Sequence, residues 1–277
     1  MKFFKWLLSL IKKEKPGPVS PPIFTTGDLQ KGYTVDSVDL LEEHVRMISS
    51  LGFRPSIRIV FDFPLPPKDY AYAVEKLSEV ATIVGQPCDS TYAKKMTPLQ
   101  YKDRFKAYVQ QLPWVSIWEI GNEVNGDWAG ANTALQTELA LQIAKAAGKK
   151  VMLTPYWNTE ICADTHGQFI PWLEKNLSLY VKNNCDYVCT SFYGYDCDNG
   201  AEPSHGDISA VLAKLAVMFY PAKVGIGEYG KEGNAKIMRH YLDYRPPSGL
   251  PFVNFGGYWY GFQDLVKSTK LLQEFKR

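Results

Sequence analysis

The chain has 277 residues, of which 45% are hydrophobic and 22% are charged. This composition excludes disordered and collagen-like proteins, and it supplies enough apolar side chains for a large buried core. The formal net charge is only +2. Because the basic residues form no stripe along the folded part of the chain, no nucleic acid is expected as the main partner.

The first thirteen residues, MKFFKWLLSLIKK, predict an amphipathic helix with a basic polar face. Its apolar stretch, residues 6–11, is too short to span a bilayer. The segment begins like a signal peptide, but no small-x-small cleavage site precedes Pro16. We therefore expect weak contact of residues 1–13 with an anionic membrane surface, which favours an extracytoplasmic or membrane-associated location. A cleaved signal peptide and a frayed terminus are the alternatives.

Residues 15–22, KPGPVSPP, are a proline-rich linker, because proline disfavours both helices and central strands. The linker separates a tail, residues 1–22, from one folded domain, residues 23–277. In this domain, short apolar runs alternate with longer segments of helical period. The predicted strands are residues 23–25, 56–61, 81–85, 116–121, 150–154, 187–191, 223–227 and 253–258. The predicted helices are residues 38–51, 68–80, 98–112, 132–147, 168–183, 207–219, 234–244 and 262–275.

Strands and helices that alternate eight times predict an α/β fold, a single parallel (β/α)8 TIM barrel. A doubly wound open sheet is the alternative, but no GxGxxG motif follows an early strand. Functional residues of a barrel lie on the loops after the carboxyl ends of its strands. In this sequence those positions hold mostly carboxylates, amides and aromatic rings.

Two glutamates stand at the ends of the fourth and seventh predicted strands. Glu123 lies in WEIGNEVNGDW, residues 118–128, and Glu228 lies in VGIGEYG, residues 224–230. A closed barrel brings both to one mouth. Glycosidic bond cleavage needs such a pair, in which one carboxyl protonates the leaving oxygen and the other attacks the anomeric carbon. A single glutamate after a strand more often stabilises the next helix, but the pair favours catalysis.

The Asn-Glu pair after the fourth strand and the lone Glu after the seventh resemble clan A of the retaining glycoside hydrolases. The resemblance covers most of the chain from about Ile23. It implies that Glu123 is the general acid/base, that Asn122 binds the sugar 2-hydroxyl and that Glu228 is the nucleophile. A retaining mechanism would place the two carboxyl groups about 5–5.5 Å apart.

Further positions match the clan pattern. Arg58 in IRIVFDF resembles the arginine near the nucleophile, and Tyr193 in SFYGY could donate a hydrogen bond to it. Trp259 in GGYWYGF resembles the aromatic residue that ends the eighth strand. Trp157 and Trp128 follow the fifth and fourth strands. Their rings could stack on sugar C–H faces or simply pack against the protein.

Together these features predict a glycoside hydrolase that acts on the β-glycosidic bonds of a poly- or oligosaccharide. The expected partner is a carbohydrate substrate, and the sequence predicts no cofactor, no metal and no particular oligomeric state. The spacing of the five cysteines matches no zinc motif, and a bridge between Cys162 and Cys197 is one pairing that the sequence allows.

Two other functions stay open at this point. The first is a barrel enzyme acting on a phosphorylated substrate, bound by backbone amides at Gly230, Gly233 and Gly256. Such enzymes usually need a lysine or metal ligands inside the barrel, and the predicted strand ends show neither. The second is a non-catalytic carbohydrate-binding barrel, against which the presence of both glutamates argues.

Overall fold

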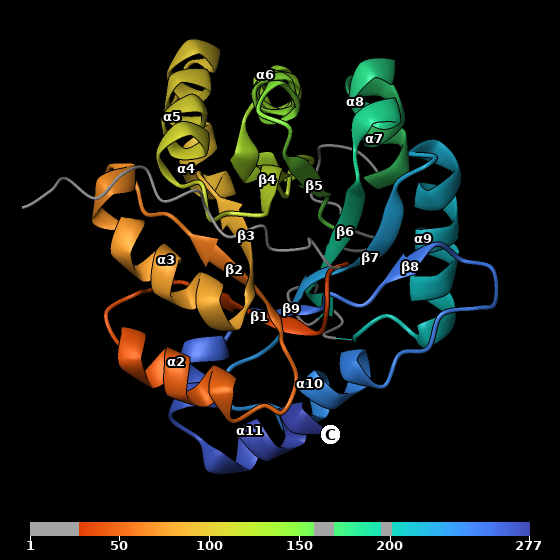
Figure 1. The fold of residues 1–277 in the computed structure, drawn as a ribbon. Coiled ribbons are helices and arrows are strands. Elements are labelled where there is room, and N and C mark those ends of the chain that lie inside the picture. Colours follow the sequence, from red (N-terminus) through yellow and green to blue (C-terminus); the bar gives the residue numbers. More distant parts are fainter. Residues whose placement is uncertain (1–27, 158–168, 195–200) are drawn as a thin grey trace, which may run out of the picture.

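The computed structural model describes residues 28–157, 169–194 and 201–277, which form a closed parallel barrel (Figure 1). Each strand from β1 to β7 pairs in parallel with the next one along the chain. The short strands β8 and β9 both pair with β7, and β9 also pairs with β1, which closes the barrel. The predicted (β/α)8 barrel is thus confirmed. The strands are β1 (Gly32–Val35), β2 (Ser56–Val60), β3 (Thr82–Gln86), β4 (Ile117–Asn122), β5 (Lys150–Thr154), β6 (Tyr187–Phe192), β7 (Lys223–Tyr229), β8 (Phe252–Val253) and β9 (Gly257–Tyr258).

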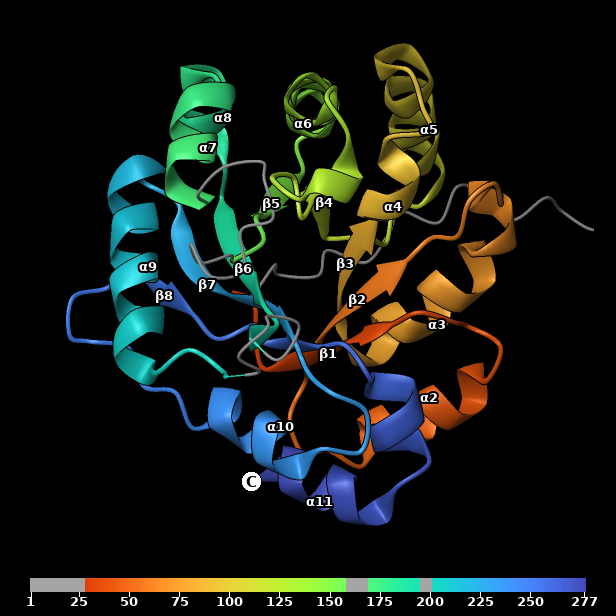
Figure 2. The ribbon, with the colours of Figure 1, turned by 180° about the vertical axis from the view of Figure 1, so that it is seen from behind.

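Helices surround the barrel, as the two opposite views show (Figures 1 and 2). Reciprocal capping boxes start two of them, formed by Thr97 with Gln100 before α5 and by Ser204 with Asp207 before α9. The α-helices are α2 (Leu41–Ser49), α3 (Ala71–Val80), α4 (Ser90–Ala93), α5 (Pro98–Gln111), α6 (Thr133–Ala146), α7 (Phe169–Asn176), α8 (Leu179–Asn184), α9 (His205–Met218), α10 (Ala235–Leu242) and α11 (Thr269–Lys276). Shorter helical segments are η1 (Pro67–Asp69), η2 (Asp127–Ala129) and the π-helical η4 (Gly261–Val266).

Three predicted elements differ from the structure. Residues 23–25 lie outside the described residues, and the first barrel strand is β1, where a Cβ at Gly32 would overlap the carbonyl oxygen of Ser56 on β2. The predicted strand 253–258 is two short strands, because the intervening Gly256 has φ +50°. The described part of the predicted helix 168–183 is divided into α7 and α8, and Ser178 caps the second of them.

The barrel interior has two layers with different chemistry. The lower layer, toward the amino-terminal ends of the strands, is a buried apolar cluster of Leu29, Val84, Ile117, Met152, Tyr187, Cys189, Val253 and Phe255. The upper layer, toward the carboxyl ends, consists of the buried polar residues Thr34, Arg58, Gln86, Glu119, Asn122 and Thr154. Residues two apart on one strand share a face, so Met152 and Thr154 on β5 belong to successive layers. A second apolar core fills the space between the barrel and the helices.

The amino-terminal ends of the strands form the base of the barrel. Asp28, the first described residue, forms an ion pair with Lys223 at the start of β7. It also accepts a hydrogen bond from the hydroxyl of Tyr187 at the start of β6 (3.3 Å). Lys150 on β5 donates in turn to that hydroxyl (3.1 Å). The chain therefore joins the barrel at the base, opposite the loops that follow the strands.

Within the described residues, none of the helices has both the length and the apolar character needed to cross a membrane.

Candidate active site

The carboxylate of Glu228 lies at the carboxyl end of β7 and is almost completely buried. Strand pairing places it beside Ser191 of β6 and Gly257 of β9. The hydroxyl of Tyr193 donates to Oε1 (2.6 Å), and the guanidinium of Arg58 forms an ion pair with Oε2. Two donors, one on β2 and one directly after β6, thus fix the orientation of this carboxylate.

Arg58 lies in the middle of β2 and is completely buried. Besides its contact with Glu228, its Nη1 lies 3.5 Å from Oε1 of Glu119, and its Nη2 donates to Oγ1 of Thr34 (2.9 Å). Burial alone would lower the pKa of Arg58, but the two carboxylates more than compensate, and the pKa is raised. Arg58 is therefore a permanent cation that links two acids.

Glu119, in the middle of β4, is a third carboxyl group in this cluster, and a search confined to strand ends misses it. Its Oε1 accepts a hydrogen bond from Nδ2 of Asn122 (3.4 Å). Burial raises its pKa to about 7, although the charge of Arg58 acts in the opposite direction. One sequence signal could have revealed this residue. A lone acid within a buried strand needs a buried partner, and Arg58 is the matching lone base on β2.

Asn122, the last residue of β4, connects the carboxylates to the loop after β3. Its Nδ2 lies 3.5 Å from Oε2 of Glu228, and its Oδ1 accepts a hydrogen bond from the backbone N–H of Ser90 (3.2 Å). The indole N–H of Trp128 donates to Oγ of the same serine (2.9 Å). The loops after β3 and β4 thereby hold each other beside the carboxylate cluster.

Glu123 follows β4 directly, and the residue as a whole is partly exposed. Its φ of +46° lies in the left-handed region, which is uncommon for residues other than glycine and costs energy. Burial of the carboxyl group raises its pKa well above the usual value, and the negative charges of Glu228 and Asp89 raise it further. The side chain therefore favours the protonated form, as an acid catalyst requires.

The three tryptophans predicted to bind substrate lie on loops after β4, β5 and β9, and each is partly exposed. The ring of Trp259 lies 5.7 Å from the guanidinium carbon of Arg58. Trp128 meets Tyr156 edge to face with ring centroids 4.9 Å apart. Trp157 packs near Phe192 with centroids 5.8 Å apart. Of these tryptophans, Trp259 is the one with a contact to a residue of the carboxylate cluster.

Arg104 on α5 holds the rim of the mouth above β2 and β3. Its guanidinium donates to the backbone carbonyls of Phe61, Asp62 and Leu65 after β2 and of Pro87 after β3, at distances of 2.6–3.0 Å. These bonds fix the paths of two loops beside the candidate site.

A metal site or a disulfide needs histidine, cysteine or acidic side chains that lie close together. In the described ranges, three or more His, Cys, Asp or Glu side chains do not converge in a way that could hold a metal ion. Cys88, Cys185 and Cys189 are free and buried. The pair Cys162 and Cys197, for which the sequence allows a bridge, lies outside the described residues.

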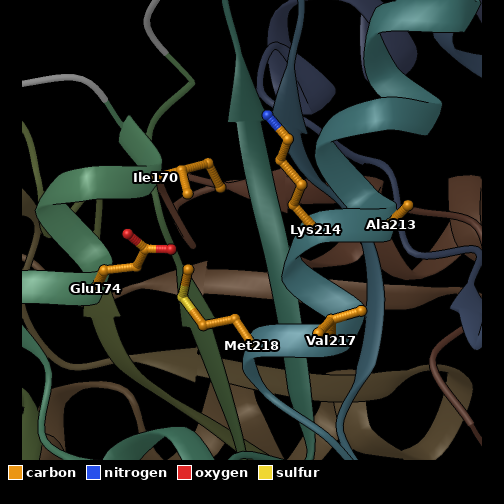
Figure 3. A pocket seen from close by; sticks show the side chains of 6 residues that line it. All are labelled: Ile170, Glu174, Ala213, Lys214, Val217 and Met218. Carbon is orange, nitrogen blue, oxygen red and sulfur yellow. The ribbon is translucent and has the colours of Figure 1, made fainter.

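A separate groove of about 650 Å³ lies on the outside of the barrel between α7 and α9 (Figure 3). Its lining is mostly aliphatic, with one acid and one base: Ile170, Glu174, Ala213, Lys214, Val217 and Met218. It shares no residue with the carboxylate cluster. The chemistry of the molecule is therefore concentrated at the mouth.

Neither the protein-family models nor the curated proteins give a match to this chain. Solved structures do match. A GH30 endoxylanase from Clostridium papyrosolvens has a TM-score of 0.58 at 12% identity, over 90% of this chain and 71% of that one. The FMN-binding β-glucuronidase from Facaelibacterium prausnitzii has a TM-score of 0.51 at 14% identity, over 86% and 38%. An oxaloacetate acetylhydrolase also reaches 0.51, at 9% identity, over 85% and 76%. The chain thus shares the fold of glycoside hydrolases and of barrel enzymes with other chemistries.

Proposed function

We propose that this protein is a retaining glycoside hydrolase that cleaves β-glycosidic bonds of a poly- or oligosaccharide. One observation carries the proposal. A fixed carboxylate, Glu228, shares the mouth with a second carboxyl group, Glu123, whose pKa is raised by burial and by the charge of Glu228 itself. Two interacting carboxyl groups in different environments are the arrangement that glycosidic cleavage needs.

In the first step of the proposed reaction, Glu123 donates its proton to the glycosidic oxygen while an oxygen of Glu228 attacks the anomeric carbon. The carbon–oxygen bond to the leaving group breaks, and a glycosyl ester forms on Glu228. Glu123, now ionised, then takes a proton from a water molecule that attacks the same carbon, and the ester bond to Glu228 breaks to release its carboxylate. The sugar leaves with its original configuration, and both carboxyl groups return to their starting states.

The neighbouring residues have supporting roles in this proposal. Arg58 and Tyr193 hold the carboxylate of Glu228 for in-line attack, and Asn122 is placed to bind the sugar 2-hydroxyl beside it. Trp259 offers a partly exposed ring next to Arg58 for an apolar sugar face. Trp128 and Trp157 are proposed as outer contacts of a longer substrate. The endoxylanase and the β-glucuronidase of similar fold act on glycosides, which agrees with this reading.

The test is a screen of neutral β-linked polysaccharides for release of reducing sugar, with the Glu228→Gln variant as the matched control. We expect the wild-type chain to cleave at least one polymer. The Glu228→Gln variant should cleave none of them. Binding of a polysaccharide without cleavage would instead indicate a carbohydrate-binding barrel. Turnover of a phosphorylated compound, with no glycoside cleaved, would indicate a barrel enzyme that acts on phosphorylated substrates.

A further inference from the structure

Acidic side chains predominate at the mouth of the barrel, which also carries Lys68, Lys94, Lys95 and Lys231, and basic side chains predominate at the base. At the mouth, acidic side chains follow most of the described strands, among them Asp36, Asp62, Asp89, Asp127, Glu202 and Glu232. At the base, basic side chains lie at or just before the strand starts: Lys31, Arg54, Lys149, Lys150, Lys223 and Arg245. The molecule therefore has an electric dipole along the barrel axis.

Ion pairs account for the acids at the base but leave a surplus of cations. Asp28, Asp186 and Asp243 pair with Lys223, Lys145 and Arg239, respectively. Other cations donate to backbone carbonyls, which carry no net charge. Lys149 binds the carbonyls of Pro113 and Val115, and Arg245 binds those of Leu242 and Tyr244. Their positive charge therefore stays available to an external partner.

Lys31 and Arg245, two cations of the base, lie near each other and near Arg239, which is paired with Asp243. Lys31, before β1, donates to the carbonyl of Phe275 (2.8 Å). Burial lowers its pKa, and the charges of Arg239 and Arg245 lower it further. Adjacent cations of this kind repel one another, and an anionic surface would relieve that repulsion.

The chain joins the barrel at this same end, because Asp28 bonds to the first residues of β6 and β7. Residues 1–27 therefore connect at the base, and they include the basic amphipathic sequence of residues 1–13. One short amphipathic segment binds a membrane weakly, and stable attachment usually needs a second signal such as a basic patch.

We propose that the cationic base of the barrel docks on an anionic lipid bilayer together with residues 1–13, so that the mouth faces away from the membrane. The acidic mouth is repelled by the same surface, and this repulsion reinforces the orientation. A site facing away from the bilayer is open to large polymers. This inference does not depend on the reaction at the mouth.

The first test measures sedimentation of the full chain with phosphatidylcholine vesicles, with and without 30 mol% phosphatidylglycerol. We expect binding only to the anionic vesicles and its loss at high salt. The double variant Lys149→Glu, Arg245→Glu should bind at least about tenfold more weakly, since two charges on the docking face are reversed. The matched control, Lys68→Glu with Lys94→Glu, makes the same charge change with exposed residues at the mouth and should bind no more weakly than the wild type.

Melting temperatures identify a variant that fails to fold, and Lys149→Gln with Arg245→Gln then replaces it as a milder change. Hydrogen exchange provides a second test of orientation. Anionic vesicles should slow exchange in residues 145–151 and 243–251 and leave residues 87–97 at the mouth unchanged.

Equal binding to both kinds of vesicle, equal weakening by the mouth variant, or protection of residues 87–97 would overturn the proposal. Tight binding of soluble polyphosphate that displaces the chain from vesicles would also overturn the proposal, because the base would then be a binding site for a soluble polyanion.

Discussion

The lower and upper layers of the barrel interior are both buried, yet they contribute to the protein in different ways. The lower layer consists almost entirely of apolar side chains, whose burial stabilises the fold. The upper layer buries a guanidinium and two carboxyl groups, and removing such charges from water costs free energy that their pairing only partly restores. The comparison indicates that the lower layer stabilises the barrel and that the upper layer contains the buried charges of the candidate site.

The largest expected effect in the upper layer concerns Glu228. The substitution Glu228→Gln keeps the shape of the side chain but removes the proposed nucleophile, so kcat should fall by more than about 10⁴-fold on every glycoside that is cleaved. The free energy of unfolding should fall far less, since little packing changes. Reducing-sugar assays and urea unfolding measure the two quantities. A loss of activity below tenfold would contradict the assigned role.

Glu123 should give a smaller and substrate-dependent effect. Glu123→Ala removes the proposed acid catalyst, which should lower kcat by about 10²–10⁴-fold on natural substrates. An aryl glycoside with a good leaving group needs little protonation, so its first step should survive and the glycosyl-enzyme should accumulate. Azide, which attacks without a base, should then restore turnover and yield a β-glycosyl azide.

The matched control for Glu123 is Asp127→Ala, which removes an exposed acid of the same loop. It should change neither kcat nor the response to azide. If azide instead rescues Glu228→Ala alone, the roles of the two glutamates are reversed.

A change in the lower layer should have the opposite signature. Met152→Ala leaves a cavity in a fully buried apolar cluster and should lower the free energy of unfolding by about 3 kcal/mol. At temperatures where the variant is folded, kcat should stay close to the wild-type value. Thr154→Val, one position further up the same face of β5, is the control from the upper layer. A large loss of kcat in Met152→Ala would show that the layers are not separable.

The effect expected for Glu119 appears as a dependence of stability on pH. Because its pKa in the folded state is about 7, above the usual 4.5, the folded protein binds the extra proton between these values. The unfolding free energy should therefore fall as pH rises from about 4.5 to 7, by about 3 kcal/mol from this group. Glu119→Gln should remove that part of the decline. Parallel pH profiles for the two proteins would exclude the effect.

Hydrophobic periodicity predicts most of this fold, because seven of the eight predicted strand regions coincide with barrel strands or with the divided β8 and β9. The first strand could not be found in this way. Its run GYTV is short and begins with glycine. The glycine is needed because β2 approaches the backbone closely at this point, and hydrophobic periodicity carries no information about such a tertiary contact. The break at Gly256 likewise depends on a left-handed backbone conformation.

The candidate site is predictable to the extent that barrel topology brings strand ends together. Glu123, Glu228 and Asn122 follow from that rule, and Arg58 and Tyr193 follow from the resemblance to a known clan. The structure places Arg58, Tyr193 and Asn122 around Glu228, while their roles stay proposals. Neither the strand-end rule nor the resemblance identifies Glu119, because it lies within β4 and its ion pair is with Arg58 on β2.

The bonds of Arg104 have a consequence for how this protein could acquire new substrates. Because its guanidinium recognises main-chain carbonyls, which every residue possesses, the loops after β2 and β3 keep their anchor whatever side chains they carry. Leu65, well exposed on one of these loops, can thus be replaced in a mutant library without loss of these backbone bonds. Selection at such positions can alter substrate specificity while Arg104 keeps the backbone of the two loops in place.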